Sequence, residues 1–178
     1  MREALIVCSV RSPGANSRRG NLRQTRPDEL CAQVVEAALA KVPNLKPEMV
    51  DDLVLGCSFP EAEQGLNFAR LIALRTKLGI KTPAFTINRF CSSGLQAIAL
   101  AAQNIMVGWS DIVVAGGIES MSRVPMGGFI QRPWPEWTDT YPEPYVAMGI
   151  TAEIVAAKYG ISRQEQDEFA LRSHQRAT

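Results

Sequence analysis

The sequence predicts an α/β fold built on a parallel-rich sheet. Short apolar runs of strand length alternate with longer segments in which apolar residues recur at helical spacing. The connections between successive runs are too long for hairpins, so the strands are expected to be joined by crossover helices and to run parallel. The length of 178 residues suits one medium-sized domain, or a domain with part of a second.

Four apolar runs are expected to be the strands. They are residues 4–10 (ALIVCSV), 53–57 (LVLGC), 84–87 (AFTI) and 111–115 (DIVVA). The first run is continuously apolar, which is typical of a strand covered on both faces. With the helices between them, these strands predict the order βαβαβαβ within residues 1–120.

Three helices are expected between these strands. The first opens at Pro27, a residue favoured at the first helical position, and carries an apolar stripe. The second covers residues 67–78 and ends at Gly79, which suits a left-handed cap. The third covers residues 92–107 and is rich in small and apolar residues on all sides, which predicts burial on most sides. Gly108 is expected to end it.

The alternation stops after residue 118. Residues 125–144 contain five prolines and two tryptophans without periodicity, which predicts a long loop that is functional or leads into another domain. Two helices are expected next, one over residues 152–158 capped by Thr151 and one from residue 163. Ser162 and Glu165 form a capping box for the second helix.

The last predicted helix reaches the end of the sequence without a stop signal. We therefore expect residues 121–178 to be the beginning of a second domain and the chain to be a truncated product. No internal repeat, dinucleotide-binding motif, phosphate-loop motif or HExxH motif is present in the sequence.

Charge and hydropathy exclude several classes of function. Lys plus Arg total 19 and Asp plus Glu total 18. No basic block is interleaved with aromatic residues, so nucleic-acid binding is not expected. No run approaches the ~20 apolar residues that span a bilayer, and the start of the chain has no signal pattern. We expect no integral membrane contact and a cytoplasmic location.

The four cysteines are widely spaced without a CxxC pair, and His174 is the only histidine. This pattern predicts neither a metal site nor a disulfide framework, and it favours a reducing compartment. Cys8, Cys31 and Cys57 lie in apolar runs, where a buried, inert thiol is expected.

Cys91 has a different setting, in residues 87–94 (INRFCSSG). It follows the end of a strand and falls at or just before the first turn of an apolar helix. Unpaired N–H groups and the helix dipole stabilise a thiolate there. The carboxyl ends of strands in open α/β sheets are also where ligands bind. From these residues alone, a reactive nucleophile and a buried cysteine beneath a helix start are equally well supported.

The surrounding segments resemble those of thiolases, the acetyl-CoA acyltransferases. INRFCSSGLQAIALAAQNIMVG and DIVVAGGIESMSRVPM resemble their nucleophile helix and following strand. MREALIVCSVRSP is similar to their first strand, and LGCSFPEAEQGLNFARLIAL to the loop and helix before the nucleophile. MGITAEIVAAKYGISRQEQDEFALRSHQRA is similar to the helical loop domain that they insert after the fourth strand. The resemblance covers essentially all 178 residues in order.

The resemblance implies a thiolase-like fold and a two-step reaction. Residues 1–120 would be the amino-terminal half of the core, residues 121–178 the beginning of the loop domain, and the carboxy-terminal half would be absent. In such enzymes the cysteine that matches Cys91 attacks a 3-ketoacyl-CoA, acetyl-CoA leaves, and CoA releases the shortened acyl group. CoA and acyl-CoA are then substrates, no other cofactor or metal is implied, and a homodimer or homotetramer is expected. Ala147, where short-chain biosynthetic members often carry histidine, favours the degradative type and fatty acid beta-oxidation.

The resemblance also assigns further residues, each with a plainer alternative. Met148 matches a pocket-lining methionine of the family's MGxTAE motif, and simple packing is the alternative. Gln64, Asn67 and Arg70 match a segment at the dimer interface, and a polar loop is the alternative. Glu119, which follows the fourth strand, is expected either near Cys91 or in a turn.

Thiolases also use a histidine from a Gly-His-Pro motif and a second cysteine from a Cys-x-Gly motif. Both belong to the second half of a chain about twice this long, and neither motif occurs here. His174, on a polar helix face, does not replace them, so we expect the chain to be inactive alone. A non-catalytic assembly or CoA-binding module of the same fold remains an alternative. A ketoacyl synthase is a second alternative, disfavoured because those enzymes lack a stretch like residues 148–170.

Overall fold

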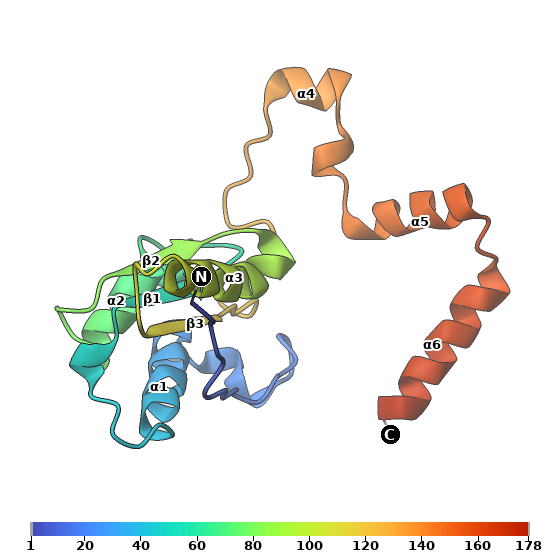
Figure 1. Ribbon diagram of the computed structural model, residues 1–178. Coiled ribbons are helices and arrows are strands. Elements are labelled where there is room, and N and C mark those ends of the chain that lie inside the picture. The colour runs from blue at the N-terminus through green and yellow to red at the C-terminus, as the bar shows by residue number, and fades with distance from the viewer. Residues whose placement is uncertain (1, 178) are drawn as a thin grey trace. The chain divides into compact units, whose positions relative to one another are not determined.

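The computed structural model describes residues 2–177 and divides them into two compact units. The first unit ends at Gln131 and contains the sheet, and the second begins at Arg132 and is helical (Figure 1). The change of domain that the sequence predicts at residue 120 stays a prediction. The assignment of the second unit to an inserted loop domain stays a prediction.

Three parallel strands form the sheet of the first unit, in the order β2-β1-β3. β1 spans Asp52–Gly56, β2 spans Ala84–Ile87 and β3 spans Val113–Gly117. At the carboxyl ends of the strands, Gly56 lies in register with Ile87 on one side and with Gly117 on the other. The predicted α/β class with a parallel sheet is confirmed.

Helices cover both faces of the sheet. α1 (Pro27–Ala40) and α2 (Phe68–Arg75) share one buried cluster with β1, while α3 (Ser93–Met106) packs on the opposite face. Side chains alternate along β1, so Leu53 and Leu55 face α1 and α2. Gly56 points instead toward the start of α3.

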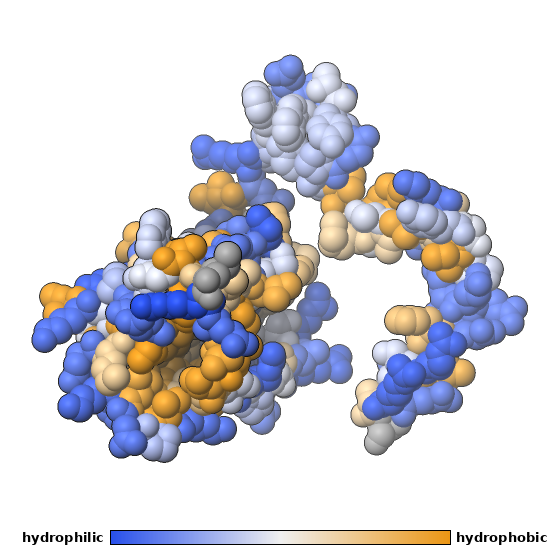
Figure 2. Space-filling model, viewed as in Figure 1, coloured by the Kyte–Doolittle hydropathy of each residue, from blue (hydrophilic) through white to orange (hydrophobic). Residues whose placement is uncertain are grey.

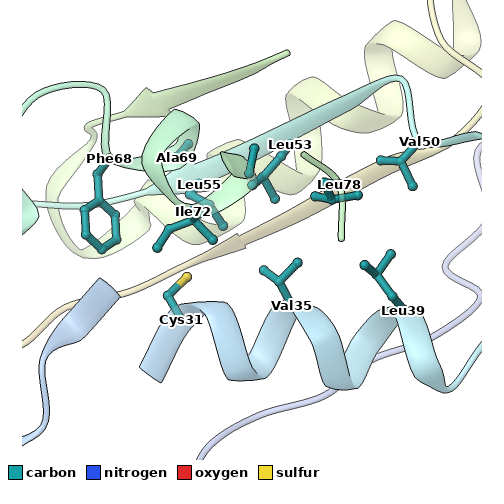
Figure 3. Close-up of a cluster of buried hydrophobic side chains, with 11 residues drawn as sticks. Cys31, Val35, Leu39, Val50, Leu53, Leu55, Phe68, Ala69, Ile72 and Leu78 are labelled. Carbon is teal, nitrogen blue, oxygen red and sulfur yellow. The ribbon is translucent and has the colours of Figure 1, made fainter. Parts of the chain in front are cut away.

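The core lies between α1, α2 and β1 (Figure 3). Cys31, Val35 and Leu39, on one stripe of α1, point toward the sheet and α2. Leu53 and Ile72 are completely buried opposite them. Burying an aliphatic side chain of this size contributes roughly 1.5–3 kcal/mol, so this layer is the main source of stability of the first unit.

The predicted strand at residues 4–10 is wrong. This segment has no regular structure, and Leu5, Ile6 and Val7 are 70%, 80% and 78% exposed. An apolar pattern predicts burial, but a strand also needs a neighbour to hydrogen-bond with. Such a partner is non-local and cannot be read from the run itself. Cys8, expected to be buried, is only half-buried as a result.

An open groove of about 1040 Å³ lies beside this segment. Its walls come from residues 4–17, α1, α3 and β3, and most are apolar side chains such as Val34, Ile105 and Val114. Figure 2 shows apolar side chains gathered around this hollow. Among the described strands, β3 pairs only with β1, so its other edge faces the groove without a strand partner.

The expected burial of the third helix on most sides is also wrong for the described chain. Ser93, Ala97 and Ala101, spaced four residues apart, are its buried stripe. Leu95 is 71% exposed and Ile98 is 42% exposed. Small residues on the buried stripe let α3 lie close to the sheet, while its larger apolar side chains have nothing to pack against among the described residues.

Local signals at the ends of these helices are confirmed. Gly79 and Gly108 adopt φ values of +63° and +81°, the left-handed conformation that glycine accepts most readily. α2 ends at Arg75 and is extended by turns to Gly79. Single 3₁₀ turns lie at Asn21–Gln24, Pro47–Met49, Ala62–Gln64, Phe90–Ser92 and Glu143–Tyr145.

The second unit contains three helices among its described residues. α4 (Pro135–Thr140) lies in the segment expected to be irregular, and its Trp137 stacks on Trp134 with ring centroids 5.3 Å apart. Aromatic stacking supplies a local contact that has no periodicity in the sequence. α5 covers Met148–Tyr159 and α6 covers Arg163–Ala177.

The start of α5 differs from the prediction. The helix begins at Met148, so Thr151 lies inside it and donates its hydroxyl proton to the Ala147 carbonyl oxygen at 3.4 Å instead of capping the helix. The capping box of α6 is confirmed, because Ser162 N–H donates to the Glu165 carboxylate at 2.8 Å. Glu165 N–H donates back to the Ser162 hydroxyl at 3.3 Å. No helix in the described range is long and apolar enough to cross a membrane.

Candidate active site around Cys91

Cys91 lies in the 3₁₀ turn Phe90–Ser92, between the end of β2 and the start of α3. Of the four cysteines, all within the described residues, it alone is exposed. It therefore stands at the carboxyl edge of the parallel sheet, the edge where ligands bind in open α/β folds. The helix proper begins at Ser93, slightly later than predicted.

The turn is held by the side chain of Asn88. Its Oδ1 accepts a hydrogen bond from Phe90 N–H at 2.8 Å, and its Nδ2 donates to the Ser58 carbonyl oxygen at 2.9 Å. Phe90 has a φ of +47°, which is costly for a residue with a side chain. Asn88 offsets that cost by accepting from Phe90 N–H, which has no helical hydrogen-bond partner in this tight turn.

Two serines complete the turn. The Ser93 hydroxyl accepts from Arg89 N–H at 2.9 Å and donates to the Phe90 carbonyl oxygen at 2.5 Å. The Ser92 hydroxyl donates to the Arg89 carbonyl oxygen at 2.9 Å. Both side chains are thus turned back onto the backbone that carries Cys91, and the space in front of the thiol stays open.

Glycines at the strand ends let α3 approach the sheet. A Cβ atom on Gly56 would lie 2.5 Å from the Ser93 carbonyl carbon and 2.7 Å from Gly94 N. A Cβ atom on Gly117 would lie 3.1 Å from the Gly56 carbonyl oxygen. Sequence reasoning missed the role of Gly56, although a glycine inside a strand run is a signal of close backbone approach.

A buried polar cluster lies beneath this edge of the sheet. Gln64 is completely buried, and its Nε2 donates to the Phe59 carbonyl oxygen at 2.9 Å and to Glu119 Oε1 at 2.8 Å. Its Oε1 accepts from Ser120 N–H at 2.6 Å. Glu119 Oε2 accepts from Ser58 N–H at 2.6 Å. Two residues singled out in the sequence for different reasons, Gln64 and Glu119, are therefore direct partners.

Asn67 and Arg70 also have partners within the chain. Asn67 Oδ1 accepts from Arg70 N–H at the start of α2, and its Nδ2 donates to the Ala84 carbonyl oxygen at 2.8 Å. The Arg70 guanidinium donates to the carbonyl oxygens of Thr82 and Ile80. The contacts described for Gln64, Asn67 and Arg70 all lie within the chain. Their role in a dimer interface stays a prediction.

Met148 and His174 belong to the second unit, and Cys91 belongs to the first. Met148 is the first residue of α5 and is 70% exposed, and His174 is on the exposed α6. The pocket-lining role of Met148 stays a prediction. Within residues 2–177, no group of three or more histidine, cysteine or acidic side chains is arranged to hold a metal ion.

Two of the other thiols are held in the protonated form. Burial raises the pKa of Cys31 to about 12. Burial, with the nearby Glu119 carboxylate, raises the pKa of Cys57 to about 12. Because the thiolate is the nucleophilic form, neither residue is suited to nucleophilic chemistry near neutral pH.

Comparison with known proteins identifies the family. A family model described as "Thiolase, N-terminal domain" matches residues 4–178. The 3-ketoacyl-CoA thiolase of Bacillus subtilis is 50% identical over 99% of this chain and 45% of its own length. That of Shewanella loihica is 40% identical over 99% of this chain and 46% of its own length.

A solved structure agrees with this assignment. The acetyl-CoA acetyltransferase of Bacillus anthracis superposes with a TM-score of 0.70 and 36% identity, covering 88% of this chain and 42% of that chain. The α/β fold of this chain is therefore one that it shares with part of that acetyltransferase. The chain belongs to the thiolase family. It spans about half the length of the relatives it matches.

Proposed function

We propose that Cys91 is the nucleophile of a thiolase that cleaves 3-ketoacyl-CoA with CoA into acetyl-CoA and a shortened acyl-CoA. The observation that carries the proposal is the position of Cys91: it is the exposed thiol, on a turn built at the carboxyl edge of the sheet. Relatives named 3-ketoacyl-CoA thiolase support this substrate class, the first of them at 50% identity.

The reaction has two acyl-transfer steps. The Cys91 thiolate attacks the 3-keto carbon, the bond between carbons 2 and 3 breaks, and the electron pair leaves on acetyl-CoA, which takes up a proton. The thiolate of free CoA then attacks the acyl-cysteine carbonyl carbon, and the Cys91 thiolate leaves. Dividing the cleavage into these steps avoids one difficult carbon–carbon displacement.

The proton transfers need a positioned acid and a positioned base. His174, the only histidine of the sequence, lies on α6, whose side chains are exposed. A positioned acid or base is typically worth ~10²–10⁴-fold in rate. From the family resemblance, we assign these roles to a histidine and a second cysteine of the carboxy-terminal half that the resemblance implies.

The same missing part would cover surfaces that the described residues leave open. The groove beside β3 and the outward side of α3 are apolar and exposed, with Leu95 and Ile98 at 71% and 42%. Monomers rarely expose large contiguous apolar patches. A carboxy-terminal half of matching length would bury both. A homo-oligomer, a role in fatty acid degradation and a cytoplasmic location belong to the same proposal.

The decisive experiment compares Cys91→Ser with wild type in the full-length protein, using acetoacetyl-CoA and CoA. We expect wild-type protein to form an acyl-cysteine at residue 91 that mass spectrometry locates, and the variant to lose turnover while it folds normally. A serine hydroxyl is a far poorer nucleophile than a cysteine thiolate. Turnover near the wild-type rate in Cys91→Ser would refute the assignment.

A protein of residues 1–178 alone should be assayed beside the full-length protein. We expect no turnover from residues 1–178 alone, and turnover when the carboxy-terminal half is added. Acyl-CoA binding without turnover in the full-length protein would instead support the non-catalytic, CoA-binding alternative.

A further inference from the structure

The three strands of the sheet are tied together at the edge that carries Cys91. Ser58 follows β1, Asn88 follows β2 and Glu119 follows β3. Glu119 Oε2 accepts from Ser58 N–H at 2.6 Å, and the Ser58 carbonyl oxygen accepts from Asn88 Nδ2 at 2.9 Å. Asn88 Oδ1 in turn accepts from Phe90 N–H at 2.8 Å, one residue before Cys91. This set of bonds, the cross-tie, runs from Glu119 to the Cys91 turn.

The turn depends on the cross-tie because its backbone is strained. Phe90 holds a φ of +47°, a conformation that persists only when its surroundings impose it. Cys91 sits on this turn before α3 begins, so any relaxation of Phe90 moves the thiol. Asn88 accepts from Phe90 N–H through one end of its amide and donates to the Ser58 carbonyl oxygen through the other, and the Phe59 and Phe90 rings lie 6.1 Å apart beside it.

Glu119 is held in place from the other side. Its Oε1 accepts from the buried Gln64 amide at 2.8 Å while its Oε2 accepts from Ser58 N–H. Hydrogen bonds to a carboxylate are stronger than those between neutral groups. Among the described ion pairs none includes Glu119, so its carboxylate serves these N–H donors rather than a cation. It fixes Ser58, and Ser58 fixes Asn88.

We propose that Asn88 and Glu119 are positioning residues for Cys91 and set the direction of its thiol through this cross-tie. The inference rests on the proposed role of Cys91 as nucleophile. It goes further, because it assigns the alignment of the attacking atom to two side chains other than the nucleophile. Misplacement of a reacting group by ~1 Å can cost ~10²-fold in rate, so loss of the cross-tie acts mainly on the chemical step.

The structure offers a matched control at the opposite edge of the sheet. Asp51 Oδ2 accepts from Asp111 N–H at 2.6 Å and from Ile112 N–H at 3.0 Å, just before β1 and β3. Like Glu119, Asp51 is a carboxylate that accepts backbone N–H groups and links β1 to β3. Because it lies at the amino ends of the strands, Asp51→Asn tests the structural value of such a tie without touching the Cys91 turn.

The test uses full-length protein with acetoacetyl-CoA and CoA, and measures kcat, KM for CoA and the single-turnover rate of Cys91 acylation. We expect Asn88→Ala to lower kcat and the acylation rate roughly 10- to 100-fold, with KM changed less than about threefold. Glu119→Gln should lower them less. The double variant should be no worse than Asn88→Ala, because both act along one path. Asp51→Asn should lower the melting temperature and leave kcat within about twofold.

Two further results complete the design. Asn88→Asp keeps an acceptor for Phe90 N–H but places a carboxylate oxygen, which repels the Ser58 carbonyl oxygen, where the donor was, so it breaks the cross-tie at that bond if Asn88→Ala does not fold. A folded Asn88 variant with kcat near wild type, or effects of Asn88→Ala and Glu119→Gln that simply multiply, would overturn the positioning role. Turnover in Cys91→Ser would instead overturn the nucleophile itself, so the two failures are distinguishable.

Discussion

Gly56 and Ser93 lie against each other where β1 ends and α3 begins. A Cβ atom on Gly56 would be 2.5 Å from the Ser93 carbonyl carbon, closer than real Cβ atoms approach such a group. The first turn of the helix after Cys91 therefore rests directly on the backbone of the central strand. The absence of a side chain at residue 56 sets the height of Cys91 above the sheet.

Gly56→Ala should destabilise the first unit by about 1–3 kcal/mol, because the helix must shift to admit the methyl group. Gly94→Ala is the matched control in the same helix, since a Cβ atom there meets no other group within 4 Å. Glycine inside a helix is less favourable than alanine by roughly 0.5–1 kcal/mol, so this control should be neutral or stabilising. Urea denaturation of both variants checks the pair. Equal stabilities would show that the close approach is not restrictive.

Brief alkylation near neutral pH should label Cys91 first. Cys91 is exposed, whereas Cys31 and Cys57 are buried with pKa values raised to about 12. Peptide mapping by mass spectrometry gives the order of labelling, and repetition in urea confirms that all four thiols react once the chain unfolds. Labelling of Cys31 or Cys57 before Cys91 in folded protein would contradict the assignment.

Stability should fall in acid partly through Glu63. The hydrogen-bonded Arg123 guanidinium holds the pKa of Glu63 below its ordinary value of 4.5. The folded state then binds a proton at Glu63 less readily than the unfolded chain does. The stabilisation is therefore present above the unfolded pKa and is lost as the pH falls toward the folded one. Between about pH 6 and pH 3, Glu63→Gln should lose less free energy of unfolding than wild type. Parallel curves for the two proteins would exclude this contribution.

Two isoleucines should differ sharply in their effect on stability. Ile72 is completely buried in the core, and Ile6 is 80% exposed beside the groove. In a protein of residues 1–178 alone, Ile72→Ala should lower the free energy of unfolding by about 2–5 kcal/mol and Ile6→Ala by less than about 0.5 kcal/mol. Chemical denaturation measures both. In the full-length protein the cost of Ile6→Ala should rise, because the proposed carboxy-terminal half would cover the groove. An unchanged cost there would argue against that covering.

Features that depend on neighbouring residues were predictable from the sequence. The capping box of Ser162 and Glu165 and the left-handed Gly79 and Gly108 are confirmed because each is decided within one helical turn. Residues 4–10 failed for the opposite reason, since strand pairing depends on a distant partner. Thr151 was misjudged because helix ends shift by a residue or two when more than one start is available.

The site was predictable only in part. The chain order placed Cys91 between strand and helix, and the structure agrees. Gln64 is expected from the sequence at a dimer interface or in a polar loop. In the structure it is completely buried, because Glu119, Ser120 and Phe59 satisfy its amide. Hydropathy predicts that polar side chains are exposed, so it does not identify those that are buried because they hydrogen-bond to one another. The cross-tie through Asn88 could therefore not be predicted from the sequence, because it joins three strand ends that are far apart along the chain.

The groove beside β3 has a consequence for folding during synthesis. Residues 4–10 are synthesised before the rest of the first unit, yet no described strand pairs with them. If chain beyond residue 178 fills the groove, that contact closes a very long loop, and such contacts form late in folding. Until then the nascent protein carries an apolar edge of the kind that chaperones shield. A substitution in the carboxy-terminal half would then cause misfolding of the amino-terminal half before it lowers catalytic activity.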